Sequence, residues 1–120
     1  MTNIKQNDLI QSVADAFQFI SYYHPKDFIT ALGKAYELEQ GHGAKDAIAQ
    51  ILTNSRMCAE GHRPMCQDTG IAVVFLKIGM NVQWPDATMS VTEMVNEGVR
   101  RAYLNPENTL RASVLADPAG

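Results

Sequence analysis

The sequence has few cysteines and no long apolar run, and each of these absences narrows what the chain can be. Cys58 and Cys66 are the only cysteines among 120 residues, too few for the disulfide framework of a small secreted domain. No window approaches the roughly 20 consecutive apolar residues of a membrane-spanning helix, and the first residues lack the pattern of an export signal. We therefore expect a cytoplasmic protein that has no membrane partner and whose thiols are reduced or bind a metal.

An excess of positive charge is also missing. Ten Lys and Arg stand against thirteen Asp and Glu, which gives a net charge of -3. Such a chain creates no field that attracts phosphate backbones, so nucleic acid is not an expected partner. Apolar residues make up 46% and charged residues 19% of the sequence, which is typical of a globular protein and argues against general disorder. The length predicts one domain.

Apolar residues recur at steps of three and four in three early segments, which predicts amphipathic helices. The first helix is expected over residues 7–22, the second from Pro25 to about Leu38, and the third over residues 44–58, after a break at Gly41-His42-Gly43. The inward faces are expected to consist of Leu9, Ile10, Val13, Ala14, Phe17 and Ile20 in the first helix, Phe28, Leu32, Ala35 and Leu38 in the second, and Ala47, Ile48, Ile51 and Leu52 in the third.

A fourth helix is expected to begin at Ser90. Ser90 and Glu93 form a Ser-x-x-Glu capping box, in which each side chain satisfies a backbone N–H of the other residue. Asn105-Pro106 should end this helix, because a residue before proline disfavours helical torsions. The inward face would contain Val91, Met94, Val95, Val99 and Ala102. The residues from 107 to 120 are expected to form a loop.

Residues 71–78, with the sequence IAVVFLKI, form a nearly unbroken apolar and β-branched run. This pattern predicts a strand that is covered on both faces. Residues 80–84 offer either a continuation of this strand or a weak second strand after a turn at Gly79. The pairing partner of the main strand is either a poorly signalled segment or lies outside these residues, and the second alternative agrees better with the pattern. We therefore expect a predominantly helical α+β fold, with four or so helices and one or two strands, as an incomplete N-terminal part of a larger domain.

Residues 57–70, which connect the third helix to the predicted strand, are the densest in groups that can carry chemistry. They include two thiols, an imidazole, a guanidinium, an amide and carboxylates. From these residue types alone, Cys66 could be a metal ligand, a nucleophile paired with His62, or a small buried residue. A zinc site is a weak alternative, because the two cysteines lack the short spacing of structural zinc sites. An ordinary polar turn is the remaining alternative.

The core of this segment, Cys66-Gln67-Asp68-Thr69-Gly70, is distinctive when taken with the residues around it. The run from His62 to Gly70, preceded by Asn54-Ser55-Arg56-Met57, resembles the N-terminal iron-sulfur loop of class I fumarate hydratases and of the related tartrate dehydratases. The resemblance continues to Asn108-Thr109-Leu110-Arg111, which is similar to the substrate-loop segment of that family. It covers roughly the second half of the chain.

The resemblance implies a 4Fe-4S cluster that is held by three cysteines and has a fourth iron open to substrate. Cys66 matches the first of the three ligands, whereas Cys58 matches none and is expected to be a helix-face residue. Gln67 and Asp68 would then hydrogen-bond the substrate, and Arg111 would pair with a substrate carboxylate. The other two ligands and the catalytic base would lie outside these residues. His62 and Arg63 receive no catalytic role, and His24 and His42 are expected at helix boundaries.

The implied activity is the interconversion of L-malate and fumarate in the tricarboxylic acid cycle. The chain would be the N-terminal fragment of a hydro-lyase catalytic domain, inactive in isolation. Its partners would be a small dicarboxylate and the remainder of the enzyme chain or a second subunit, with a homo-oligomer when complete. The alternatives are a tartrate dehydratase-type hydro-lyase and a non-catalytic helical assembly module.

Overall fold

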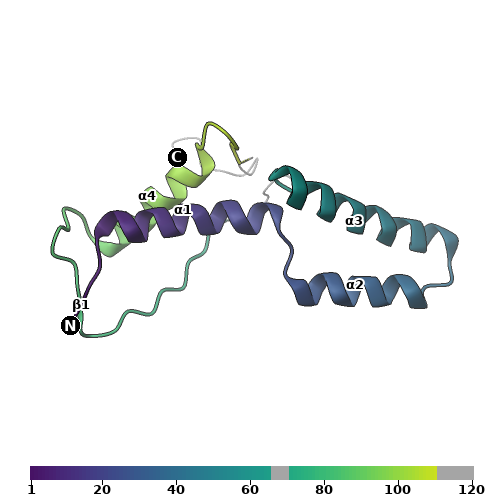
Figure 1. Ribbon diagram of the computed structural model, residues 1–120, viewed down its shortest axis with the longest axis horizontal. Helices are drawn as coiled ribbons and strands as arrows, with labels where there is room; N and C mark the ends of the chain where they lie inside the picture. The colour runs from purple at the N-terminus through teal and green to yellow at the C-terminus, as the bar shows by residue number, and fades with distance from the viewer. Residues whose placement is uncertain (66–70, 111–120) are drawn as a thin grey trace. The chain divides into compact units, whose positions relative to one another are not determined.

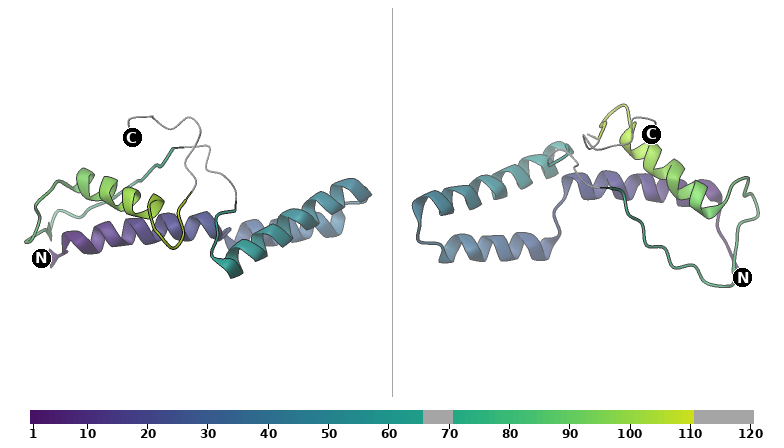
Figure 2. Two further views of the ribbon diagram at one scale, coloured as in Figure 1. Left: turned by 90° about the horizontal axis from the view of Figure 1, so that it is seen from above. Right: turned by 180° about the vertical axis from the view of Figure 1, so that it is seen from behind.

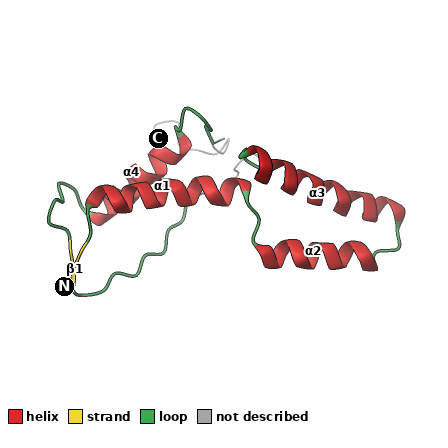
Figure 3. Ribbon diagram, in the orientation of Figure 1, coloured by secondary structure: helices red, strands yellow, loops and turns green. Residues whose placement is uncertain are grey.

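The computed structural model describes residues 1–65 and 71–110. Helices dominate these residues (Figures 1 and 3), so the predominantly helical α+β fold expected from the sequence is confirmed. The elements in chain order are β1 (Thr2–Asn3), α1 (Gln6–Tyr22), α2 (Lys26–Leu38), α3 (His42–Gly61), β2 (Val82–Gln83) and α4 (Val91–Tyr103). The chain divides into two compact units, and the chain passes from one to the other within α1 and after Cys66. Unit 1 is Met1–Gln18 with Gln67–Gly120, and unit 2 is Phe19–Cys66.

Unit 1 contains two strand-helix pairs with the same orientation. β1 and β2 are parallel, with Thr2 opposite Val82, and each strand leads into a helix, α1 or α4. At the start of α1, the amide N–H of Gln6 donates to Asp86 Oδ1 at 3.0 Å, just before α4. Towards the ends of both helices, Gln18 Nε2 donates to the carbonyl of Ala102 at 2.7 Å. The start of α1 is thus bonded to the segment just before α4, and the last turns of the two helices are bonded to each other. The helices therefore run side by side in the same direction, as Figure 2 also shows.

The core of unit 1 forms where α1 meets α4. The buried apolar residues are those whose spacing predicted the inward faces: Ile10, Val13, Ala14 and Phe17 from α1, and Met94 and Ala102 from α4. Gly98 lies at the closest approach, where a Cβ atom would come within 2.7 Å of the carbonyl oxygen of Ile10. One prediction was wrong, because Ile20 is 59% exposed. Ile20 lies beyond Gln18 on α1, in the turn that belongs to unit 2.

The ends of α4 are as the sequence predicts. Ser90 Oγ accepts from the amide of Glu93 at 3.2 Å, and Glu93 Oε2 accepts from the amide of Ser90 at 2.7 Å, so the capping box is formed. The helix ends at Tyr103, before Asn105-Pro106. The capping hydrogen bonds therefore determine where α4 begins, and the steric restriction before Pro106 agrees with where it ends.

The strand predicted over residues 71–78 was wrong. These residues carry no strand assignment and run as a loop on the way to β2 (Figure 1), and Ile71 and Phe75 are 86% and 96% exposed. An extended segment becomes a strand only where another backbone pairs with it, and no other segment among the residues that the structure describes pairs with this one. The weaker prediction over residues 80–84 is confirmed in part, because β2 lies within this range. Its partner β1 was not predicted, because a strand of only two residues is too short to show an alternating pattern in the sequence.

Unit 2 contains an antiparallel pair of helices, α2 and α3, which contact one another and lie side by side in Figure 1. α2 begins directly after Pro25, as predicted. α3 begins at His42 rather than after Gly43 and extends to Gly61, because glycine in a first helical turn interrupts few hydrogen bonds. The expected inward faces are only partly covered: no residue of α2 is buried, and α3 buries Ser55 and Cys58.

None of the helices in the described part of the chain is both long enough and apolar enough to span a bilayer.

Candidate functional site

The four residues predicted to touch the cluster or the substrate, Cys66, Gln67, Asp68 and Arg111, all lie outside the described residues. Their roles therefore stay predictions. The structure does describe the residues immediately before Cys66 and before Arg111. Each of these two segments is held by hydrogen bonds from more distant parts of its own unit.

In unit 2, the chain leaves α3 through a left-handed residue. His62 caps the helix with φ 51°, and its backbone N–H donates to the carbonyl of Cys58. The amide of Arg63 donates to the same carbonyl at 3.1 Å. A left-handed cap lets the chain turn back while the last carbonyl groups of the helix remain paired. The two residues that follow, Pro64 and Met65, are thus directed along α3.

Met65 is the last described residue before Cys66, and both of its backbone groups are bonded. Its N–H donates to the carbonyl of Ser21, near the end of α1, at 2.9 Å. Its carbonyl accepts from Nδ2 of Asn54, on α3, at 3.3 Å. The segment is therefore fastened on two sides, by α1 and by α3, directly before the predicted ligand.

Cys58 is part of the same arrangement and faces inward. Its side chain is buried, with 7% exposure, and Sγ lies 3.6 Å from both Asn54 Oδ1 and the carbonyl oxygen of Pro64. A buried thiol that donates to these oxygens is a small structural residue. This environment agrees with the helix-face role predicted for Cys58.

Two histidines of unit 2, His24 and His62, contact aromatic rings and hydroxyl groups. The ring of His62 stacks on Tyr22 with centroids 4.8 Å apart, and its Nε2 lies 3.1 Å from the hydroxyl oxygen of Tyr23. In the connection between α1 and α2, Nδ1 of His24 lies 2.9 Å from Ser55 Oγ. Within residues 1–65 and 71–110, no group of three His, Cys, Asp or Glu side chains could hold a metal ion. The zinc alternative therefore gains no support from the described side chains.

In unit 1, the residues before Arg111 are fastened by one buried glutamine. Gln18, which is 8% exposed, donates through Nε2 to the carbonyl oxygens of Ala102 and Asn108 at 2.7 and 2.8 Å. Its Oε1 accepts from Nδ2 of Asn108 at 3.0 Å. Leu110 follows and is buried in the core, with 5% exposure. The chain therefore reaches Arg111 from a fixed starting point.

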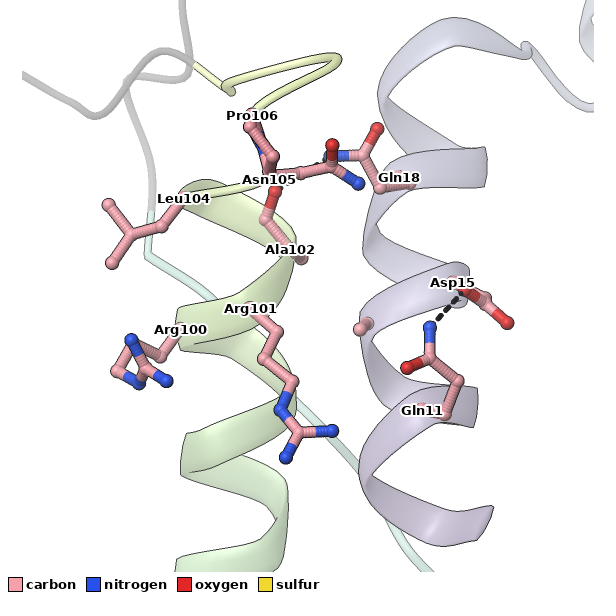
Figure 4. A pocket seen from close by; sticks show the side chains of 10 residues that line it. Gln11, Asp15, Gln18, Arg100, Arg101, Ala102, Leu104, Asn105 and Pro106 are labelled. Carbon is pink, nitrogen blue, oxygen red and sulfur yellow. Dashed lines mark hydrogen bonds between the residues drawn. The ribbon is translucent and has the colours of Figure 1, made fainter. Parts of the chain in front are cut away.

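A cleft of about 310 Å³ lies between α1 and α4 in unit 1. Gln11, Asp15 and Gln18 line it from α1, and Arg100 and Arg101 line it from α4, as Figure 4 shows. Both arginines already pair with Glu97, at 2.7 and 3.1 Å. Hydrogen bonds from Arg100 and then Arg101 lower the pKa of Glu97 to about 2. Nε and Nη2 of Arg100 and Nε of Arg101 already donate to this one carboxylate, so these donors are not available to a substrate carboxylate.

The cysteines of the chain fit an iron-sulfur cluster only in part. Cysteine thiolates are the usual protein ligands of such clusters, and Cys66 is a suitable donor by residue type. Cys58 is unsuitable, because its thiol is buried and donates to carbonyl oxygens of its own unit. The 120 residues contain no further cysteine. They therefore offer one ligand, and a cluster bound by three thiolates would need two from elsewhere.

Sequence reasoning missed the residues that hold these two segments, namely Gln18, Ser21 and Asn54. Gln18 interrupts the apolar face of α1 next to Phe17, and a polar residue at the edge of a buried stripe was the available signal. Asn54 had a weaker signal, because it opens the Asn54-Ser55-Arg56-Met57 run that precedes the loop. Ser21 contributes its backbone carbonyl, for which the sequence carries no signal.

Comparison with known proteins identifies the family. The family model described as fumarate hydratase (fumerase) matches residues 10–120. A protein of Methanocaldococcus jannaschii that is provisionally named L(+)-tartrate dehydratase subunit alpha is 36% identical over 103 residues, which are 86% of this chain and 35% of that protein. The anaerobic class I fumarate hydratase of Escherichia coli is 32% identical over 103 residues, 86% of this chain and 17% of that enzyme.

The chain thus spans about a third of one relative and about a sixth of the other. The family resemblance noted in the sequence is confirmed, and the matched region contains both the Cys66 loop and the segment that ends at Arg111. Membership of this family implies an iron-sulfur cluster in the complete enzyme. Because the family model matches nearly the whole chain, the chain belongs to the fumarate hydratase (fumerase) family.

Proposed function

We propose that this chain supplies part of the active site of an iron-sulfur hydro-lyase that interconverts L-malate and fumarate, as a class I fumarate hydratase does. The observation that carries the proposal is the family match over residues 10–120, which includes the distinctive Cys66-Gln67-Asp68-Thr69-Gly70 run. A non-catalytic helical module is the weaker explanation, because helix packing alone does not require this run of thiol, amide, carboxylate and hydroxyl groups.

The reaction sets the tasks that the residues must perform. Dehydration of malate breaks the C–OH bond at C2 and the C–H bond at C3, and the C–H electron pair becomes the double bond of fumarate. An open cluster iron, when bound, acts as a Lewis acid that stabilises the departing hydroxide. In the proposal, the Cys66 thiolate is one cluster ligand, Gln67 and Asp68 hydrogen-bond the substrate, and Arg111 pairs with a carboxylate in a bidentate manner. The base that removes the proton lies outside these residues.

The fastened segments before Cys66 and Arg111 support this assignment. A ligand and a carboxylate receptor both lose effectiveness when their geometry varies by as little as about 1 Å. The hydrogen bonds at Met65 and Asn108 provide fixed attachment points for the segments that carry these two residues. Ordinary surface loops do not need such support.

The proposal includes a partner, because the chain offers one cluster ligand and an incomplete sheet. We infer that a β-strand from the polypeptide that completes the enzyme, in the same chain or in a second subunit, pairs with residues 71–78. Large apolar residues are exposed along this segment, including Ile71, Val73 and Phe75 at 86%, 56% and 96%, and the matched residues make up only 35% and 17% of the two relatives. The complete enzyme is proposed to be a homo-oligomer. Because cluster thiolates must stay reduced, the cytoplasm is the proposed location.

A tartrate dehydratase activity is the second candidate. It is favoured by the 36% identity to the protein named for that activity. L-malate and tartrate both carry two carboxylates and a 2-hydroxyl group, and tartrate has one hydroxyl more. A site that binds the additional hydroxyl would discriminate strongly against malate, because its polar groups would otherwise be left unpaired.

Anaerobic reconstitution of the full-length protein with iron and sulfide tests both candidates. Fumarate absorbance would be followed as a gain with L-malate and as a loss with fumarate, and formation of the keto acid produced by dehydration would be followed with tartrate. We expect turnover of malate and fumarate with the higher kcat/KM. Preferred turnover of tartrate would replace the first candidate by the second, and a cluster-loaded protein that is inert towards all three acids would refute the proposed activity.

A further inference from the structure

We propose that Asn54 is a positioning residue for the cluster ligand Cys66. Its side-chain amide joins α3 to the backbone directly before Cys66, through Met65. The proposal rests on the function proposed above, since it concerns how Cys66 is held for the cluster. In this role Asn54 acts through the backbone of Met65.

Asn54 uses both ends of its amide. Nδ2 donates to the carbonyl of Met65 at 3.3 Å, and Oδ1 accepts from Sγ of Cys58 at 3.6 Å. Cys58 Sγ is also 3.6 Å from the carbonyl oxygen of Pro64. The single thiol proton is shared between these two oxygens. Asn54 and Cys58 therefore hold two consecutive backbone carbonyls, those of Pro64 and Met65, against α3.

An asparagine is well suited to this position because its amide is both a donor and an acceptor. An aspartate of the same shape would still accept from the thiol of Cys58, but it would place a carboxylate against the carbonyl of Met65. An alanine would make neither contact. Since Asn54 is an exposed residue of α3, its replacement changes these hydrogen bonds without leaving a cavity in the core.

The second fastening makes the role of Asn54 specific. The N–H of Met65 is bonded to the carbonyl of Ser21, at the end of α1. Without Asn54, the bond to Ser21 would have to hold the Met65 backbone without support from the carbonyl side, so it would open more often. Residues that orient a metal ligand through a hydrogen bond typically contribute about 10- to 100-fold to metal affinity or activity. We expect an effect at the lower end, because the hydrogen bond from Asn54 is long.

The test compares three variants of the full-length protein, Asn54→Ala, Asn54→Asp and Gln50→Ala. Gln50 is an exposed polar residue one turn earlier on α3 and serves as the matched control. In the cluster-free protein, hydrogen exchange of the Met65 amide is expected to be several-fold faster in both Asn54 variants and unchanged in the control. In the reconstituted protein, anaerobic loss of iron to a chelator is expected to be about 10-fold faster in both Asn54 variants.

The same variants separate a positioning role from general stability. Asn54→Asp preserves the shape of the side chain, so this variant provides the test if Asn54→Ala fails to fold. The thermal unfolding midpoint of the cluster-free protein should change little, whereas the electron paramagnetic resonance spectrum of the oxidised cluster should show a larger share of centres that have lost iron. Wild-type rates of exchange and of iron loss in both Asn54 variants would overturn the proposal.

The outcome is distinguishable from a failure of the proposed function. If the parent protein takes up no cluster, the proposed function fails, and the positioning role fails with it. If the parent loads a cluster and the Asn54 variants retain it equally well, only the positioning role fails. Exchange at Met65 requires no iron, so in both cases it reports how often the Met65 amide separates from Ser21.

Discussion

At the scale of single residues, Gly98 and Gln18 show how closely unit 1 depends on particular side chains. Gly98 allows the backbone of α4 to approach Ile10 and Val13 of α1. Gln18 satisfies two carbonyl groups beside the apolar core and fixes Asn108. Neither residue contributes to the hydrophobic effect, yet each determines whether the apolar residues beside it can pack.

Gly98→Ala should lower the free energy of unfolding by about 1–3 kcal/mol, as overpacking typically does. The added Cβ would lie 2.6 Å from Val13 Cβ and 2.7 Å from the carbonyl oxygen of Ile10, and this clash exceeds the gain of about 1 kcal/mol in helix propensity. Gly33→Ala on α2 is the matched control, since nothing lies within 4 Å of the position that its Cβ would occupy. Urea unfolding should show the control to be at least as stable as the parent, and equal effects of the two substitutions would contradict the packing argument.

Gln18→Leu should lower the free energy of unfolding by about 1–3 kcal/mol, because buried carbonyl groups would lose their donor. Ala102 and Asn108 carry these carbonyls. In the complete enzyme the same change should raise KM for the dicarboxylate more than it lowers kcat, since it loosens the segment before Arg111. Gln11→Leu, on the exposed face of α1, is the control and should leave both quantities nearly unchanged. A Gln18 variant with parental stability and KM would show that Asn108 is held by other contacts.

At the scale of secondary-structure elements, helices were predicted well and strands poorly. The periodicity of α1 and α4 and the Ser90 capping box depend on residues close in sequence, so a pattern reveals them. Residues 71–78 were predicted wrongly, because an apolar β-branched run shows that a segment would suit a buried strand. The run does not show whether another strand is present to pair with it. The hydrogen bond between Gln18 and Asn108 joins residues 90 positions apart, and no spacing rule encodes such a contact. The motif at Cys66 could be identified from the sequence, whereas the hydrogen bonds that hold the preceding residue Met65 could not.

The stability of α4 should decrease in acid because of Glu97. The folded-state pKa of this carboxyl is lowered from 4.5 to about 2, chiefly by the hydrogen bond from Arg100 and then by that from Arg101. A lowered pKa means that the stabilising contribution is fully present above pH 4.5 and is lost as pH falls towards 2. Thermal unfolding of the parent and of Glu97→Gln should therefore differ at pH 5 and converge near pH 2. Because the arginine side chains of these ion pairs are exposed, about 1 M salt should reduce the difference, and a difference that persists at pH 2 would point to another cause.

At the scale of the whole molecule, the exposed apolar segment and the missing cluster ligands lead to the same expectation. A contiguous exposed apolar surface on a folded domain marks a surface that another element covers. The two-helix unit 2 is also thinly packed, with no buried residue in α2. Both observations favour a chain that reaches its full stability only with the rest of the enzyme.

Phe75→Asp tests this expectation in the complete enzyme. Phe75 is 96% exposed in this structure, so the substitution removes almost no contact within the chain. If a strand of the completing polypeptide covers it, a buried unpaired carboxylate should lower the unfolding midpoint and the yield of assembled oligomer. Lys77→Glu, at a charged position of the same segment, should have little effect. Size-exclusion chromatography and thermal unfolding measure both, and a Phe75 variant as stable as the parent would refute pairing at this segment.

The parallel pairing of β1 with β2 also has a consequence for the order of folding. The contacts of unit 2, including those at Met65, join residues within the single stretch Phe19–Cys66. The hydrogen bond between Gln6 and Asp86 in unit 1, in contrast, joins residues 80 positions apart and cannot form until Asp86 has been synthesised. Contacts between residues close in sequence form faster than those that close a long loop, and an N-terminal segment leaves the ribosome first. The helical hairpin and the fastening ahead of Cys66 can therefore form while the chain is still being synthesised, before α1 gains the partner that covers its apolar face.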